Sequence, residues 1–192
     1  METETTDAII RATGRSLCEH GYADLTMQRI AEASSVTTAA IHYHFDTKEE
    51  LLNAFLDDLI DRFEREAVAE TSDPREQLAV VLDAVFAADP DDEFPVALME
   101  LKAQAPYHET YRQRFIELDE RLRSIIETAV ERGIDAGHFE ASAPATVARF
   151  VTTVINGGHV RTVALGEAPD ETRRVVEGYL DGELGWRPEA TA

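Results

Sequence analysis

Two short helical patterns with a break of a few residues between them constrain this chain more than any other feature. The first covers residues 26–33 and the second covers residues 37–45, which is the spacing of a helix-turn-helix. Each pattern opens on a threonine, whose hydroxyl can accept a hydrogen bond from a free backbone N–H, so Thr26 and Thr37 are predicted N-caps. The apolar side chains expected to hold the pair together are Ile30, Ala31, Val36, Ile41 and Phe45.

A third helix is predicted directly after the pair. The run Thr47-Lys48-Glu49-Glu50 matches a capping box, with Thr47 as the cap and Glu50 reaching back. Apolar residues then recur at four-residue steps, which predicts one long helix over residues 48–69. Because this helix follows the pair without a linker, anything that tilts it would move the pair.

The rest of the chain also has helical periodicity and no alternating strand pattern. Helices are predicted over residues 6–20, 74–86, 94–105 and 109–136, and two apolar stripes near the C-terminus predict two more. Gly21 and Gly137 are placed to end helices, and residues 1–5 are expected to fray. We therefore predict an all-α fold of about nine helices.

The charge balance is unusual for a folded chain of 192 residues, since 38 acidic residues face 18 basic ones. The net charge of -20 is self-repelling in dilute salt, but the hydrophobic fraction of 44% argues against disorder. Only two of the cations are lysines. This composition is typical of proteins from extreme halophiles, in which molar salt screens charge over a few ångströms.

Three further expectations come from composition. Cys18 is the only cysteine, so no internal disulfide can form, and its place on an apolar helix face predicts a buried structural thiol. No apolar run approaches the length of a membrane span, and no basic-then-apolar leader is present. A cytoplasmic protein without membrane contact is expected.

The stretch from Ile9 to Leu52 resembles the TetR-type transcriptional regulators. The matching unit reads IIRATGRSLCEHGYADLTMQRIAEA, then SVTTAAIHYHF, then DTKEELL. The resemblance implies a three-helix DNA-binding head over residues 1–47 and a helical ligand-binding and dimerisation domain over residues 48–192. It also implies a homodimeric regulator, with a repressor favoured, that leaves its double-stranded DNA operator when a small-molecule effector binds.

The DNA contacts follow from position in the matching motif. The second helix of the pair should enter the major groove, with Thr38 and Tyr43 as the foremost contacts. Lys48 matches the family lysine that meets a phosphate at a helix N-terminus. The full predicted set is Thr26, Gln28, Thr37, Thr38, Ala39, His42, Tyr43, His44 and Lys48.

Three residues depart from the family pattern. Ser35 replaces the usual turn glycine, Ala39 replaces a glycine, and His42 replaces an aromatic residue. Ser35 is therefore expected to hold a turn conformation that glycine adopts more easily. These departures put the DNA sequence preference in doubt.

The head is also acidic, with four basic and nine acidic residues over residues 1–53. DNA-binding proteins are normally basic, because phosphate contacts release counterions. In molar salt that contribution is already lost, so binding would depend on hydrogen bonds, shape and water release. An unusually shallow salt dependence is predicted.

The larger domain has material for a largely apolar pocket, although core packing is the more common role of each such residue. An apolar or amphipathic effector is expected there. The candidate pocket residues are Phe63, Phe86, Leu98, Met99, Tyr107, Tyr111, Phe115, Val151, Asn156 and His159.

The resemblance further implies that the two C-terminal helices pair with their copies in a second subunit as a four-helix bundle. The alternative is that both stripes pack within one subunit. The candidate interface residues are Val147, Val154, Gly158, Val175, Tyr179 and Leu180.

Two other functions stay open. A dimeric ligand sensor or partner-binding module of the same fold would not bind DNA, and the acidic head and the departures at Ser35, Ala39 and His42 favour it slightly. An enzyme on the same scaffold is disfavoured, because the sequence has no Gly-rich phosphate loop, no serine elbow and no metal-ligand spacing. No cofactor and no metal are expected.

Overall fold

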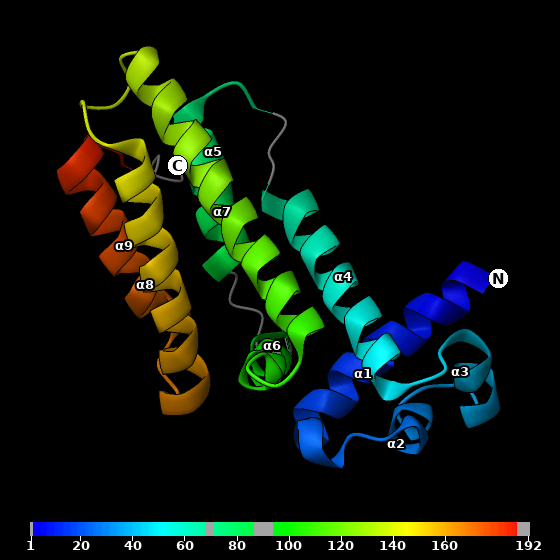
Figure 1. Cartoon of the computed structure of the whole chain (residues 1–192). Helices are drawn as coiled ribbons and strands as arrows, with labels where there is room; N and C mark the ends of the chain where they lie inside the picture. Colours follow the sequence, from blue (N-terminus) through cyan, green and yellow to red (C-terminus); the bar gives the residue numbers. More distant parts are fainter. Residues whose placement is uncertain (1, 68–70, 87–93, 188–192) are drawn as a thin grey trace. The chain divides into compact units, whose positions relative to one another are not determined.

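The computed structural model describes residues 2–67, 71–86 and 94–187, which contain nine α-helices and no strand (Figure 1). Within these ranges the prediction of an all-α chain is confirmed. The helices are α1 (Glu2–Asp24), α2 (Met27–Glu32), α3 (Thr38–His44), α4 (Lys48–Ala67), α5 (Pro74–Phe86), α6 (Phe94–Gln104), α7 (Glu109–Asp135), α8 (Pro144–Leu165) and α9 (Pro169–Leu184).

The chain divides into two compact units. The head unit contains Met1–Asp61 and Pro90–Ile116, and the body unit contains Arg62–Asp89 and Glu117–Ala192. Helices α4 and α7 each have residues in both units. The compact unit around α2 and α3 therefore includes α6 and the start of α7. The boundary predicted after residue 47 is of another kind, because it marks the end of the DNA-binding segment along the sequence.

The head unit is built on one apolar core. Ile30 of α2 and Ile41 of α3 are fully buried, and Phe45 is almost so, which confirms that these side chains hold the helix pair together. Burying one such side chain contributes about 1.5–3 kcal/mol. The same core takes in α1, α4, α6 and α7 through Ile9, Leu17, Leu51, Leu52, Leu98, Leu101 and Tyr111.

Helix α1 differs from its prediction at both ends. It begins at Glu2, so the expected fraying of residues 2–5 is wrong, and Met1 lies outside the described residues. Gly21 has φ 69° and ψ 169°, so it interrupts the helix at the predicted position through a positive φ, and a second short helical stretch continues from the kink to Asp24. Cys18 is half-buried against the core rather than fully buried.

The body unit has its own core, formed by the end of α4 with α5, α7, α8 and α9. Its close packing is clearest where α8 meets α9, because a Cβ atom on Gly158 would lie 2.4 Å from Cγ2 of Thr172. Trp186 is 1% exposed, and its Nε1 donates to the carbonyl oxygen of Arg75 at 3.1 Å. Gly137 has φ 70° and follows α7 as predicted.

Two sequence predictions fall on residues that the structure does not describe. These are the fraying of Met1 and the last residues of the helix predicted over residues 48–69. Among the described helices, none is long and apolar enough to cross a membrane.

Candidate nucleic-acid interface

Both predicted threonine caps are present in the helix pair. The Thr26 hydroxyl accepts a hydrogen bond from the backbone N–H of Arg29 at 3.2 Å, and Thr37 accepts one from Ala40 at the same distance. Both threonines have extended backbone angles, as N-cap residues do. The start of each helix is therefore fixed by its own sequence.

The turn between α2 and α3 is organised by Ser34 rather than by a glycine. Its hydroxyl accepts from the backbone N–H of Val36 at 3.1 Å and lies 3.1 Å from the carbonyl oxygen of Ala31, to which it donates. In the described part of the chain, only glycines have positive φ. The expectation that Ser35 needs a glycine-like conformation is therefore wrong, since the neighbouring serine hydroxyl closes the turn in ordinary backbone geometry.

Two arginines fasten the pair to α1. Arg15 Nη2 donates to the carbonyl oxygen of Ala33 at 2.8 Å, and Arg29 Nη1 donates to that of Asp24 at 2.8 Å. Ser16 adds a bond from its hydroxyl to the carbonyl oxygen of Arg29 at 3.3 Å. Two of the four basic residues in residues 1–53 thus hold the helix pair against α1.

The start of α4 confirms the predicted cap with one change. Thr47 accepts from the backbone N–H of Glu50 at 3.1 Å, but the Glu50 carboxylate accepts from the N–H of Asp46, one residue before the cap, at 2.9 Å. Lys48 is half-buried, and its Nζ donates to the carbonyl oxygen of Tyr22 at 3.2 Å. The same ammonium lies 4.3 Å from the centre of the Tyr22 ring.

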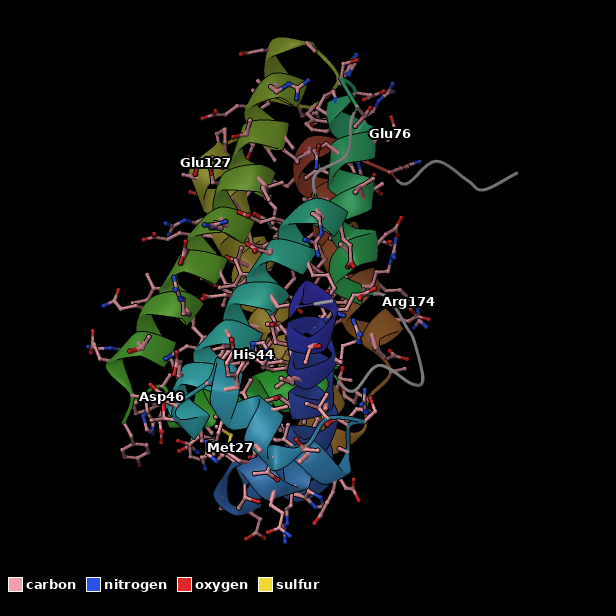
Figure 2. All side chains as sticks on the ribbon, turned by 90° about the vertical axis from the view of Figure 1, so that its right-hand side faces the viewer. Met27, His44, Asp46, Glu76, Glu127 and Arg174 are labelled. Carbon is pink, nitrogen blue, oxygen red and sulfur yellow. The ribbon has the colours of Figure 1, made fainter. Side chains whose placement is uncertain are left out.

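No residue of the predicted DNA-binding set is buried. Thr38, His44 and Lys48 are half-buried, and the other six are exposed, with Tyr43 at 79%. Figure 2 labels Met27 at the start of α2, and His44 and Asp46 around the end of α3. The Gln28 amide donates to Glu32 on its own helix at 3.0 Å, so this side chain would have to reorient to reach a phosphate.

The charge around α3 differs from that of the head as a whole. The helix has no acidic residue from Thr38 to His44. Along the chain the next acidic residues are Glu32 before it and Asp46 after it, and the Glu50 carboxylate accepts from the Asp46 N–H. A duplex that approached this face would meet hydroxyl, imidazole and phenol groups first. Such groups suit hydrogen bonding to base edges and phosphates.

The ten predicted pocket residues are divided equally between the two units. In the head unit, Leu98 and Tyr111 are buried, Phe115 packs on the core, Met99 is half-buried and Tyr107 is 81% exposed. In the body unit, Phe86 and Val151 are buried, Phe63 packs on the core and His159 is half-buried, while the Asn156 amide donates to Asp119 at 3.3 Å and to the carbonyl oxygen of Thr152 at 3.0 Å. A shared pocket stays a prediction.

The predicted dimer residues also divide into two groups. Val147, Gly158 and Leu180 are buried inside the subunit, where they have no surface to offer a second copy. Val154 and Tyr179 are half-buried, and Val175 is 57% exposed.

The contacts that Tyr22 makes with Glu100 and His108 were not predicted from the sequence. The Tyr22 backbone N–H donates to Glu100 at 2.9 Å, and its hydroxyl lies 3.0 Å from Nε2 of His108. These partners are 78 and 86 residues away along the chain, so no local pattern could reveal them. Among the described residues, no group of three or more His, Cys, Asp or Glu side chains could hold a metal ion.

Comparison with known proteins adds two family matches. Residues 9–55 match the family described as bacterial regulatory proteins of the tetR family. Residues 74–185 match the C-terminal part of BetI-type transcriptional repressors.

Individual proteins are similar over nearly the whole chain. The transcriptional regulator BetI of Agrobacterium fabrum is 27% identical and covers 98% of this chain and 92% of its own length. A TetR transcription regulator from Haloarcula marismortui is 39% identical, with a TM-score of 0.88 over 95% of this chain and 99% of that chain. A regulator from Saccharomonospora viridis in complex with choline is 19% identical and shares the fold, with a TM-score of 0.84 over 95% and 98% of the two chains.

Proposed function

Since the chain belongs to the TetR family of transcriptional regulators, we propose that it represses transcription by binding an operator through α2 and α3 as a homodimer. A small molecule bound to the C-terminal part releases the operator. The observation that carries this proposal is the helix pair, because α3 is capped, exposed and free of carboxylates in a chain of net charge -20.

In the proposed complex, α3 lies in the major groove, which is wide enough to admit an α-helix. Its N-terminal residues Thr37 and Thr38 then lie at base edges, and Tyr43 reaches the groove or its wall. Thr26 and Gln28 at the start of α2 contact the phosphates of the other strand. This placement is supported by the accessibility of all five side chains.

Lys48 supplies the phosphate contact of α4, where its charge adds to the partial positive charge of the helix N-terminus. Its ammonium is already oriented by Tyr22, at 3.2 Å from the carbonyl oxygen. With one such cation per head, most of the affinity has to come from hydrogen bonds and shape rather than from counterion release.

The homodimer uses the accessible faces of α8 and α9. Helix α8 has no acidic residue over 22 positions, although 38 of the 192 residues of the chain are acidic. Phe150 is 40% exposed and stacks on Tyr179 with ring centres 3.9 Å apart, and Val175 is 57% exposed. A second copy would cover this surface, and two-fold symmetry would present the two α3 helices to half-sites about 34 Å apart.

The effector is a small amphipathic molecule. A quaternary ammonium compound such as choline is the first candidate, because the C-terminal match is to BetI-type repressors and one protein of this fold holds choline. Methyl groups around a cation suit an apolar site with aromatic faces and a nearby carboxylate. Residues of the body unit that offer such groups are Phe63, Phe86 and Asp119.

A dimeric ligand sensor that does not bind DNA is the second candidate. The departures at Ala39 and His42, together with the acidic head, are the observations that favour it. The relatives are named as regulators and repressors, and we propose no catalytic function. A regulator that works beside the chromosome is cytoplasmic, and the acidic composition suits a cytoplasm of high salt.

The test compares two tyrosines of the head unit that are equally accessible. Tyr43 is 79% exposed and Tyr107 is 81% exposed. In molar potassium chloride, Tyr43→Ala should weaken binding to the duplex upstream of the protein's own gene about 5-fold or more, because one lost groove contact costs about 1–3 kcal/mol. Tyr107→Ala should bind like the unchanged protein in the same fluorescence anisotropy titration.

Two results would contradict the proposal. Equal affinity of both variants would remove α3 from the interface. Absence of binding by the unchanged protein at every salt concentration would favour the sensor.

A further inference from the structure

Tyr22 contacts three other segments of the chain through its backbone N–H, its carbonyl oxygen, its hydroxyl and its ring. Its backbone N–H donates to Glu100 of α6 at 2.9 Å, and its carbonyl oxygen accepts from Lys48 of α4 at 3.2 Å. Its hydroxyl lies 3.0 Å from Nε2 of His108, which directly precedes α7. Its ring lies under the Lys48 ammonium at 4.3 Å and meets the His108 ring edge-on, with centres 5.8 Å apart.

The backbone at Gly21 makes this arrangement possible. Its φ of 69° and ψ of 169° interrupt the helical path, so the N–H of Tyr22 is free of the helix ladder and bonds to Glu100 instead. A Cβ atom at Gly21 would lie 3.4 Å from the same carboxylate and would strain the backbone. The glycine therefore orients Tyr22 as well as interrupting α1.

The Tyr22 hydroxyl is a stable hydrogen-bond donor. Burial raises its pKa, and the nearby Glu49 carboxylate raises the pKa further. The phenol is therefore protonated at neutral pH and can donate to Nε2 of His108. Because the two rings also touch, moving His108 should move Tyr22.

Both lysines of the chain belong to the same unit as Tyr22. Lys48 belongs to α4, while Lys102 belongs to α6 and lies 5.8 Å from the centre of the Phe115 ring of α7. The other 16 of the 18 basic residues are arginines. Each lysine therefore reports on one aromatic contact, Lys48 on the side of the helix pair and Lys102 on the side of α6 and α7.

We propose that Tyr22 is a positioning residue for DNA binding, which links α6 and the start of α7 to Lys48 and thereby to the helix pair. This inference rests on the proposed function. A shift of α6 or of His108 changes where Tyr22 holds the Lys48 ammonium, and this alters the phosphate contact. By reciprocity, DNA that engages Lys48 must act back on α6 through Tyr22.

The test uses the two lysines as separate reporters in the full chain. Protein labelled with ¹³C at the lysine ε-carbons gives two signals, which Lys102→Arg assigns. When the upstream duplex is added in molar potassium chloride, both signals should shift in the unchanged protein. In Tyr22→Phe, which keeps the ring and removes the hydroxyl, Lys48 should still respond. The response of Lys102 should be reduced, because the contact with His108 is lost while the backbone bond to Glu100 remains.

Val96→Ala is the control, since it shortens an exposed side chain of α6 in the same unit. It should respond like the unchanged protein, and thermal unfolding should show that both variants are folded. An unaltered Lys102 response in Tyr22→Phe would overturn the inference, and so would a Lys102 signal that ignores DNA while Lys48 responds.

A measurement without DNA separates this inference from the proposed function. In the free protein, His108→Ala should shift the Lys48 signal, because the Tyr22 ring beneath the ammonium loses its partner. An unchanged Lys48 signal would overturn the link even if the protein binds DNA. Absence of DNA binding with a shifted Lys48 signal would overturn the proposed function and the DNA-binding role of Tyr22, leaving only the contact.

Discussion

Asp73 illustrates how a single side chain ties local structure to stability. Its Oδ1 accepts from the backbone N–H of Arg75 at 2.9 Å, and its Oδ2 accepts from the Arg75 guanidinium at 2.9 Å, at the start of α5. The hydrogen bond from the Arg75 guanidinium has the largest effect and the backbone bond the next largest, and they lower the pKa of Asp73 to about 2. The folded body unit therefore favours the ionised carboxylate.

A lowered pKa determines the sign of the pH effect. The ionised carboxylate contributes stability above its unfolded pKa of about 4, and this contribution is lost as the pH falls through the folded value of about 2. Over that window the unchanged protein should lose more unfolding free energy than Asp73→Asn, which keeps a capping oxygen but does not titrate. Urea unfolding followed by the fluorescence of Trp186, which is buried in the same unit, measures the difference.

Asp170→Asn provides the control, because Asp170 is an exposed residue in the first turn of α9. Its curve should parallel that of the unchanged protein. If the Asp73→Asn curve were parallel as well, the folded structure would not prefer the ionised carboxylate.

At the same scale, residues were predictable where their partners are local. The caps at Thr26 and Thr37 bond three residues ahead, and both were read correctly from the sequence. The role of Ser34 was not predicted, because the family pattern closes this turn with a glycine at the next position, which is Ser35 here. The Tyr22 carbonyl as the partner of Lys48 could not be predicted, since the two residues are 26 positions apart and meet only in the folded chain.

At the scale of elements, the helices were predictable because periodicity is a local property. Their ends are correct within a few residues, and α1 is interrupted at Gly21 as predicted, but it starts earlier and a second short helical stretch follows the kink. The partner of each apolar stripe was not predictable. Val147 and Leu180 face their own core, whereas Val175, five residues before Leu180 on α9, faces outward.

The outward face of α9 leads to a prediction about assembly. Val175→Glu should convert the dimer to a monomer, because it would place two charges in an apolar contact between copies. Val96→Glu makes the same change at a 38% exposed valine of the head unit and should leave the dimer intact. Light scattering after size-exclusion chromatography in molar salt gives both masses, and a dimeric Val175→Glu variant would place the interface elsewhere.

At the scale of the whole molecule, composition gives the charge balance, but the division into two compact units could not be predicted from the sequence. Helix α6 lies within the C-terminal family match, but its contacts place it in the head unit with α1. No periodicity predicts this, because it arises from tertiary packing and from polar bonds such as that between Tyr22 and Glu100. The DNA-binding segment is therefore supported by chain that lies far away in sequence.

The central claim is that an acidic head binds DNA through a neutral helix with few phosphate contacts, and the salt dependence of operator affinity tests it most directly. With one Lys48 per subunit as the phosphate-binding cation, a plot of log affinity against log potassium chloride concentration should have a slope of about -2, since each contact contributes about -0.9. Lys48→Gln should bring the slope close to zero. A slope of about -6 or steeper, or no binding at any salt concentration, would contradict the account.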